Sequence, residues 1–189
     1  MQKQFPGKVH LMQRPGKMGL ASAYCDGFRW AQKNNFHTVC EMDADLSHRP
    51  EDLKRIVTTS KDHDVVCGSR YVANGGTVNW GIFRQIISRF GSLYAKLILG
   101  TPINDMTGGF NAWKVSLINR SDLNTIQSEG YSFQIEMKYR AHLLGGSIKE
   151  IPIIFVERRA GQSKMSWQIA FEAFYRVWLL RFKQKQLCD

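Results

Sequence analysis

The stretch TVCEMDAD, Thr38–Asp45, decides the fold class of this 189-residue chain. Its first five residues form a short, mostly apolar run that is typical of a buried strand. The run ends directly at Asp43-Ala44-Asp45. Pro50 follows at a place that suits the first turn of a helix, where its missing N–H does no harm. The stretch therefore predicts a strand, an acidic turn and a helix in succession.

Strands and helices alternate on both sides of this stretch. Upstream, Val9–Met12 reads as a short strand and Leu20–Asn34 as a helix. Downstream, Asp64–Gly68 reads as another buried strand. The order strand, helix, strand, helix, strand predicts an α/β fold with a mostly parallel central sheet.

The second half of the chain contains longer helices. Trp80–Leu99 has apolar residues at helical spacing and predicts an amphipathic helix that ends before Gly100. The remaining predicted elements are a strand at Phe110–Trp113, a helix at Tyr131–Leu144, a strand at Ser147–Val156 and a helix at Ser166–Phe182. We expect one domain over residues 1–189, because no linker or repeat interrupts the pattern.

Composition limits the class of partner. The formal net charge of +10 favours anionic partners such as phosphorylated substrates, acidic membranes or nucleic acid. The four cysteines lack C-x-x-C spacing, which makes a zinc site or a disulfide framework improbable. The chain has neither a signal-peptide pattern at its start nor an apolar run long enough to span a bilayer. We therefore expect a protein of a reducing compartment whose membrane contact is peripheral or is supplied by a partner.

The acidic turn is the first candidate site. Ligands of parallel sheets bind at the carboxyl ends of the strands, where Asp43, Asp45 and Arg70 fall in this reading. Two carboxylates at this spacing can share a Mg²⁺ or Mn²⁺ ion that bridges to substrate phosphates. The alternative is a pair of solvated carboxylates in a turn, since the D-x-D pattern alone is weak.

Basic residues follow in separate motifs. Arg14 and Lys17, with Gly19, precede a helix and would approach a phosphate, or they form an ordinary strand-to-helix turn. Arg84 and Ser88 share one helix face. With Arg70 they would clamp a second phosphate, the alternative being solvated arginines.

The last basic motif precedes the terminal helix. Arg158 and Lys164 lie in a glycine-containing loop that would close over phosphates, although its serines equally suit a helix cap. The five histidines show no spacing typical of ligation or of a catalytic triad, so we expect them to be structural.

Five ordered blocks resemble the inverting family-2 glycosyltransferases, and within that family the polyprenol-phosphate (dolichol-phosphate) mannose synthases. The blocks are MDADLSH with Pro50-Glu51, GSRY at 68–71, DMTGGF at 105–110, GYSFQIE at 130–136, and the loop from Arg158 to Met165. Together they cover nearly the whole chain and are far more specific than any one of them.

The resemblance implies a GT-A fold and transfer of mannose from GDP-mannose to a polyprenyl (dolichyl) monophosphate, with inversion. The products would be polyprenyl-phosphate mannose and GDP, and Mg²⁺ or Mn²⁺ would be the cofactor. The implied donor site comprises Asp43 and Asp45 on the metal and diphosphate, Arg14, Lys17 and Gly19 near the nucleotide, and Arg158 and Lys164 in a closing loop. The implied acceptor-phosphate site comprises Arg70, Arg84 and Ser88.

Within this scheme the residues expected to act in catalysis are Asp45, Arg70, Arg84 and Asp105. Asp105 either orients the donor sugar or orders its own loop. Ser47 stands where many relatives have a glutamine that joins the metal shell, so it is a further candidate ligand, or water takes that place.

The front of the chain departs from the family pattern. The P-x-Y-N-E-like motif and the acidic strand end that hold the base and ribose in relatives are absent before Val9. We expect a GT-A domain that lacks its first two strands and an intervening helix, with exposed strand edges. The chain is then either truncated or a degenerate relative, and we favour truncation.

The terminal helix, residues 166–185, combines large apolar residues with Lys and Arg. It would pack against the domain or lie on an acidic membrane surface. We expect a peripheral protein at the cytoplasmic face of a membrane. Other readings stay open: transfer of glucose or an aminosugar, an inactive remnant, or a basic nucleic-acid-binding module. The last lacks any recognisable nucleic-acid-binding motif, so we expect no nucleic acid partner.

Overall fold

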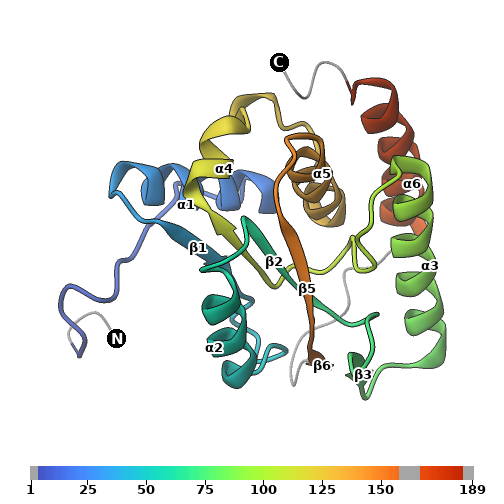
Figure 1. Cartoon of the computed structure of the whole chain (residues 1–189), viewed down its shortest axis with the longest axis horizontal. Coiled ribbons are helices and arrows are strands. Elements are labelled where there is room, and N and C mark those ends of the chain that lie inside the picture. The colour runs from blue at the N-terminus through green and yellow to red at the C-terminus, as the bar shows by residue number, and fades with distance from the viewer. Residues whose placement is uncertain (1–3, 158–166, 185–189) are drawn as a thin grey trace.

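Four strands form the central sheet of the computed structural model, which describes residues 4–157 and 167–184 (Figure 1). Their order across the sheet is β1-β4-β2-β5. β4 is antiparallel to both of its neighbours and β2 is parallel to β5, so β1, β2 and β5 share one direction. The strands are β1 Thr38–Glu41, β2 Val65–Ser69, β4 Asn111–Lys114 and β5 Ile148–Pro152. The predicted α/β class with a mostly parallel sheet is therefore confirmed.

Helices cover both faces of this sheet (Figure 1). Successive strand side chains point to opposite faces. Val65 and Cys67 of β2 accordingly pack in a core cluster with α1, α4 and α5, while Val66 packs in another cluster with Ile56 of α2. The helices are α1 Leu20–Lys33, α2 Pro50–Thr59, α4 Val115–Arg120 and α5 Gly130–Leu143.

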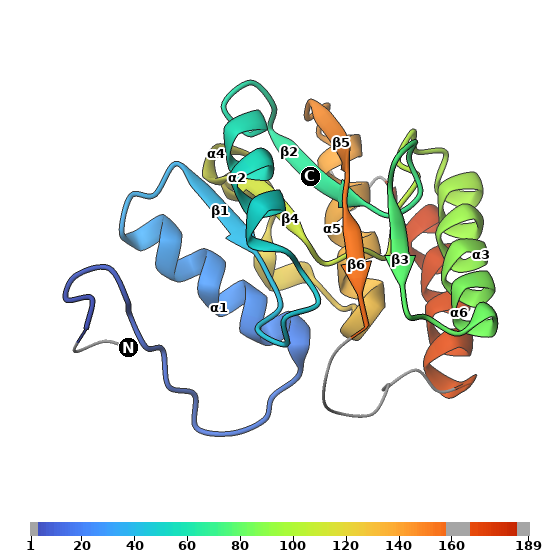
Figure 2. The ribbon, with the colours of Figure 1, turned by 90° about the horizontal axis from the view of Figure 1, so that it is seen from below.

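Two helices, α3 (Ile82–Leu99) and α6 (Trp167–Phe182), lie side by side at one end of the sheet (Figures 1 and 2). Val177 and Leu180 of α6 are buried against α3 and α5. The ring of Tyr94 on α3 stacks on Phe174 of α6, with the ring centroids 4.6 Å apart. The prediction that the terminal helix packs against the domain is confirmed for this part of α6.

The amphipathic helix predicted near residues 80–99 exists, but its large apolar side chains face outward. Its buried residues are mostly small: Ser88, Ser92, Ala95 and Leu99. Its exposed residues are mostly large: Ile82, Phe83, Ile86, Phe90, Leu93 and Leu97. Small side chains let α3 approach the loop at residues 101–110, where the Ser92 and Thr107 hydroxyls are 3.0 Å apart. α3 therefore presents an apolar surface to its surroundings.

A second, two-stranded sheet pairs β3 (Gly76–Val78) with β6 (Ile154–Val156) in parallel. The sequence predicts one strand over residues 147–156, but the structure divides it at Ile153 into β5 and β6. The Ile153 N–H donates to Ser69 O, and its carbonyl accepts from Gly76 N, both at 3.0 Å. Ile153 thereby joins the two sheets. β3, α4 and the short 3-10 helix Leu123–Thr125 were not predicted.

The strand predicted at Val9–Met12 is wrong. Residues 9–14 have no regular secondary structure, and Leu11 and Met12 are exposed. β1 pairs with β4, and within the described ranges no strand pairs with the other edge of β1. The backbone of Val9–Met12 thus lacks the ladder partners that a strand requires.

Candidate functional site

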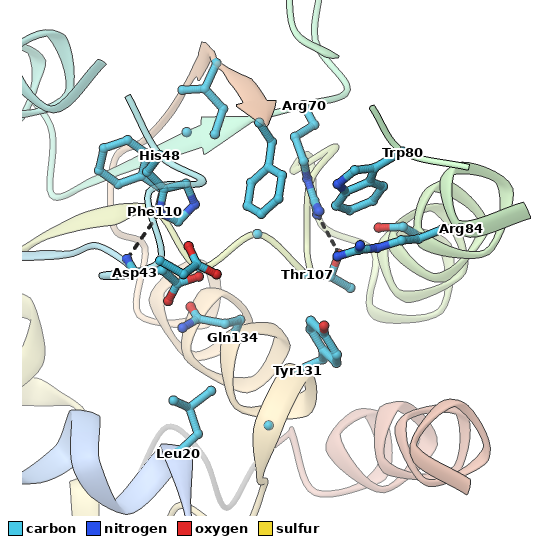
Figure 3. Close-up of a pocket in the computed structure, with 18 of the residues that line it drawn as sticks. Leu20, Asp43, His48, Arg70, Trp80, Arg84, Thr107, Phe110, Tyr131 and Gln134 are labelled. Atoms are coloured by element: carbon cyan, nitrogen blue, oxygen red, sulfur yellow. Dashed lines mark hydrogen bonds between the residues drawn. The ribbon is translucent and has the colours of Figure 1, made fainter. Parts of the chain in front are cut away.

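A pocket of about 110 Å³ opens where β1 and β2 end, beside the N-terminal half of α3 (Figure 3). Five residues singled out from the sequence line it: Asp43, Asp45, Arg70, Arg84 and Ser88. They come from segments up to 45 residues apart, so the fold brings the acidic turn and the predicted phosphate clamp to one cavity. This matches the expectation that the carboxyl ends of the strands form the site.

The acidic turn is held by its own neighbours. Asp45 Oδ1 accepts hydrogen bonds from the Ser47 N–H at 3.0 Å and the Ser47 hydroxyl at 2.6 Å. The Asp43 N–H donates to His48 Nδ1 at 3.2 Å (Figure 3). Burial lowers the pKa of His48, so the neutral ring that accepts this bond is favoured. Leu46, between Asp45 and Ser47, has a left-handed backbone conformation with φ of 66°.

The donor set suits a hard divalent cation. Asp43 and Asp45 both line the pocket and offer carboxylate oxygens, the ligands that Mg²⁺ and Mn²⁺ favour. Ser47 is fully buried and outside the pocket lining, and its hydroxyl donates to Asp45. In the part of the chain that the structure describes, no three His, Cys, Asp or Glu side chains cluster as a complete metal site. An ion held here would need substrate phosphate or water as further ligands.

A buried polar network lies beside the acidic turn. Asn111 Nδ2 donates to Glu41 Oε2 at 3.1 Å and to Gln134 Oε1 at 2.9 Å. Burial raises the pKa of Glu41 to about 7, although bonds from Asn111 and Gln134 oppose this rise. Gln134 lines the pocket near Asp43 (Figure 3). Burial and the nearby charges of Glu41 and Asp43 also raise the pKa of Tyr24, keeping this pocket phenol protonated.

Arg70 lines the pocket and is paired with Asp105, which does not. Its Nε donates to Asp105 Oδ2 and its Nη2 to Asp105 Oδ1, both at 2.7 Å, and its backbone N–H donates to Oδ2 at 2.9 Å. Arg70 Nη2 also reaches the Thr107 hydroxyl at 2.9 Å (Figure 3). Burial opposes the charge of Asp105, but Arg70 outweighs it and lowers the pKa of Asp105 to about 2. Asp105 is fully buried and does not line the pocket, so it orders Arg70 and the loop.

Arg84 meets the pocket from α3. Its guanidinium lies over the ring of Trp80, with Cζ 4.0 Å from the ring centroid. Its Nη1 lies 2.6 and 2.7 Å from the two carboxylate oxygens of Glu157. One turn further along, the Ser88 hydroxyl accepts a hydrogen bond from the Tyr71 hydroxyl at 2.7 Å. Figure 3 shows Trp80 beside both Arg70 and Arg84.

The predicted N-terminal basic group does not line this pocket. Arg14 pairs with Asp26 at 3.0 Å and also donates to Ser22, and Lys17 is exposed. Gly19 has φ of 89°, and a Cβ there would come within 2.5 Å of the Glu129 carboxylate. Arg158 and Lys164 lie outside the described residues.

Comparison with known proteins identifies the family. The sequence model for glycosyl transferase family 2 matches residues 1–121. The chain belongs to glycosyl transferase family 2. It is 44% identical over 169 residues to the undecaprenyl-phosphate mannosyltransferase of Micrococcus luteus, covering 89% of this chain and 70% of that relative. It is 40% identical to the polyprenol monophosphomannose synthase of Mycolicibacterium smegmatis, covering 91% of this chain and 65% of that relative.

Solved structures of low sequence identity share the fold. The glucosyl-3-phosphoglycerate synthase of Mycobacterium tuberculosis, in complex with phosphoglyceric acid, superimposes with a TM-score of 0.59 at 16% identity. The alignment covers 90% of this chain and 56% of that one. A complex of the same enzyme with Mn²⁺, UDP-glucose and glycerol 3-phosphate gives a TM-score of 0.57 at 14% identity, covering 95% and 58%. The family-2 chain therefore has the expected GT-A type of fold.

Several pocket residues of this family-2 chain were not singled out as site residues from the sequence. Trp80 and Phe155 lie around the arginines, and Gln134 and Tyr131 line the pocket from α5. His48 was expected to be structural, and it does hold the acidic turn, yet it also lines the cavity. Gln134 and Tyr131 belong to the block GYSFQIE, and that block could have marked them as candidate site residues. Trp80 carried no motif of its own.

Proposed function

We propose that this chain carries the catalytic site of a polyprenyl-phosphate mannosyltransferase. The donor is GDP-mannose, the acceptor is a polyprenyl (dolichyl) monophosphate, and the sugar is transferred with inversion to give polyprenyl-phosphate mannose and GDP. One of the two relatives described above is named an undecaprenyl-phosphate mannosyltransferase, and the other a polyprenol monophosphomannose synthase. The activity is a proposal for the whole protein, because the chain spans 70% and 65% of those relatives.

One observation carries this proposal: the paired carboxylates and the Arg84 side chain line the same cavity. Asp43 and Asp45 would hold Mg²⁺ or Mn²⁺ and the donor diphosphate. The bound ion would offset the charge that develops on the departing nucleoside diphosphate. Arg84, with Ser88 beside it, would bind the acceptor phosphate at the opposite side of the pocket. Arg70, neutralised by Asp105, would position this wall rather than supply net charge.

The acceptor chemistry explains why the pocket needs no strong general base. A phosphate monoester has a second pKa of about 6 and is largely dianionic at neutral pH. Its oxygen can attack the anomeric carbon without losing a proton, while the bond to the diphosphate breaks. The remaining task is to hold two anions in line and close together. His48, neutral and bonded to the Asp43 N–H, would keep the acidic turn in place.

A polyprenyl acceptor also requires contact with lipid, and the surface of α3 and α6 suits that contact. Phe83 and Ile86 are 72% and 60% exposed and lie on α3 close to Arg84, the proposed ligand of the acceptor phosphate. Phe174, Trp178 and Phe182 of α6 are exposed as well. Among the helices that the structure describes, none is both long and apolar enough to cross a bilayer. We therefore propose peripheral binding, at the cytoplasmic face, through this apolar surface.

The donor assignment is tested by competition among nucleotide-sugars. In the presence of Mn²⁺, GDP-mannose should bind and should compete better than UDP-glucose or a UDP-aminosugar. Asp43→Asn should weaken this binding at least about tenfold, since a carboxylate ligand is lost. The exposed Asp62→Asn is the matched control, with the same change in charge. Preferential binding of UDP-glucose would show that the donor sugar is glucose and not mannose. Binding that is unchanged in Asp43→Asn would contradict the proposed metal and diphosphate site.

A further inference from the structure

The two arginines of the pocket are neutralised by different kinds of partner. Arg70 pairs with Asp105, whose side chain is fully buried and which receives three hydrogen bonds from Arg70. Arg84 pairs with Glu157, whose side chain is 30% exposed. The Glu157 carboxylate accepts hydrogen bonds from Nη1 of Arg84. A fully buried partner cannot leave without a large desolvation penalty, whereas a partly exposed carboxylate can return to water. The Arg84 pair is therefore the exchangeable one.

Arg84 does not depend on Glu157 alone for its position. Its guanidinium lies over Trp80 at 4.0 Å, and Trp80 itself is buried. The Arg84 Nε atom is buried and has no hydrogen-bond partner among the described residues. A guanidinium that an aromatic face holds in place can exchange one oxyanion for another, because carboxylate and phosphate oxygens accept the same charge-assisted bonds.

The charges around the pocket show what this exchange would change. Asp43 and Asp45 contribute negative charge, while the Arg70–Asp105 and Arg84–Glu157 pairs are each neutral. Both arginines that line the pocket in the described part of the chain therefore already have a carboxylate partner when a phosphate dianion arrives. Moving Glu157 away from Arg84 would leave one full positive charge facing the phosphate.

We propose that Glu157 is a specificity-determining residue that competes with the acceptor phosphate for Arg84. It occupies the guanidinium until a phosphate displaces it, so that its charge sets the affinity for the acceptor. A neutral headgroup, such as that of a free polyprenyl alcohol, cannot replace the lost ion pair and is discriminated against. This inference rests on the proposed function, since it assigns Arg84 to the acceptor phosphate.

Equilibrium binding of farnesyl phosphate, a short polyprenyl monophosphate, tests the exchange. The chain, Glu157→Gln, Arg84→Gln and the double variant are titrated at low ionic strength, and Glu157→Ala provides a second removal of the carboxylate. Glu51→Gln is the matched control, because Glu51 is exposed outside the pocket and the substitution changes the net charge equally. Farnesol controls for binding of the hydrocarbon tail.

We expect Glu157→Gln and Glu157→Ala to bind farnesyl phosphate about tenfold more tightly, with farnesol binding unchanged. Arg84→Gln should weaken binding, and Glu157→Gln should bring no gain in its background. If Arg84→Gln weakens binding but removing Glu157 leaves it unchanged or weaker, the competition is refuted while the acceptor site stands. If farnesyl phosphate binding ignores Arg84, the proposed acceptor site and the competition both fall.

Discussion

Asp105 accepts three hydrogen bonds from Arg70, at 2.7, 2.7 and 2.9 Å, in a pair whose two side chains are both buried. The pair joins the end of β2 to the loop that precedes β4. Lys138 of α5 fixes the same loop, donating to the carbonyls of Asp105 and Gly108 at 2.7 and 2.8 Å. One wall of the pocket is thus built on ionic contacts in the interior.

Asp105→Asn should destabilise the fold strongly. It leaves the Arg70 charge buried without its counterion, and breaking a buried pair in this way costs about 3–5 kcal/mol. The free energy of unfolding in urea measures the loss. Asp62→Asn, at an exposed position, should change stability by less than about 0.5 kcal/mol. Equal stability of the two variants would show that the pair contributes little.

The same pair predicts an acid dependence of stability. The pKa of Asp105 is lowered to about 2 in the fold, against about 3.9 in an unfolded chain. Its stabilising contribution is therefore nearly complete above about pH 5 and is lost progressively as the pH falls towards 2. Unfolding free energies of the chain and Asp105→Asn, measured from pH 5 to 2, should converge on acidification. A constant difference over this window would contradict the assignment.

Lipid binding should depend on the outward face of α3. Replacing Phe83 and Ile86 together by Ser removes two exposed apolar side chains. Since burying one such side chain is worth about 1.5–3 kcal/mol, flotation with anionic vesicles should weaken at least about tenfold. Phe36→Ser with Val57→Ser, also exposed but away from this surface, should float like the unaltered chain. Equal loss in both double variants would argue against a specific lipid surface.

Trp80 should support acceptor binding through Arg84. Trp80→Leu removes the aromatic face under the guanidinium, a contact worth about 0.5–2 kcal/mol. We expect the KM for polyprenyl phosphate to rise several-fold, with a smaller rise in Trp80→Phe. The KM for the nucleotide-sugar serves as the internal control and should change little. A parallel rise in both KM values would indicate general damage to the pocket.

Much of this architecture could be predicted, because local patterns determine it. Helices α1 and α5 begin and end within one residue of their predicted limits, and the acidic turn follows β1 as expected. The outward orientation of the large apolar side chains of α3 could not be predicted. Periodicity defines an apolar face of a helix but does not show which face packs against the domain. The strand expected at Val9–Met12 failed for a related reason: a strand depends on a partner that the local sequence does not specify.

The ion-pair partners of the pocket arginines could not be predicted from the sequence either. Arg70, Arg84 and Asp105 were all candidates, but their spacing in sequence does not show that Asp105 is buried against Arg70. Glu157 was not considered at all, although it directly precedes the basic loop motif and contacts Arg84 across 73 residues. Each pair joins two segments that lie far apart in the sequence, and only the folded chain defines which segments meet.

Radiolabelled mannose, followed from GDP-mannose into lipid extracted by organic solvent, tests whether the protein transfers mannose to a polyprenyl phosphate. The chain is incubated with polyprenyl phosphate and Mg²⁺ or Mn²⁺, in parallel with Asp45→Asn and with the exposed-site control Asp62→Asn. We predict labelled polyprenyl-phosphate mannose from the chain and the control, and a loss of roughly 100-fold or more in Asp45→Asn. No labelled lipid from the chain would contradict the proposed mannosyl transfer, and equal labelling by Asp45→Asn would contradict the proposed metal site.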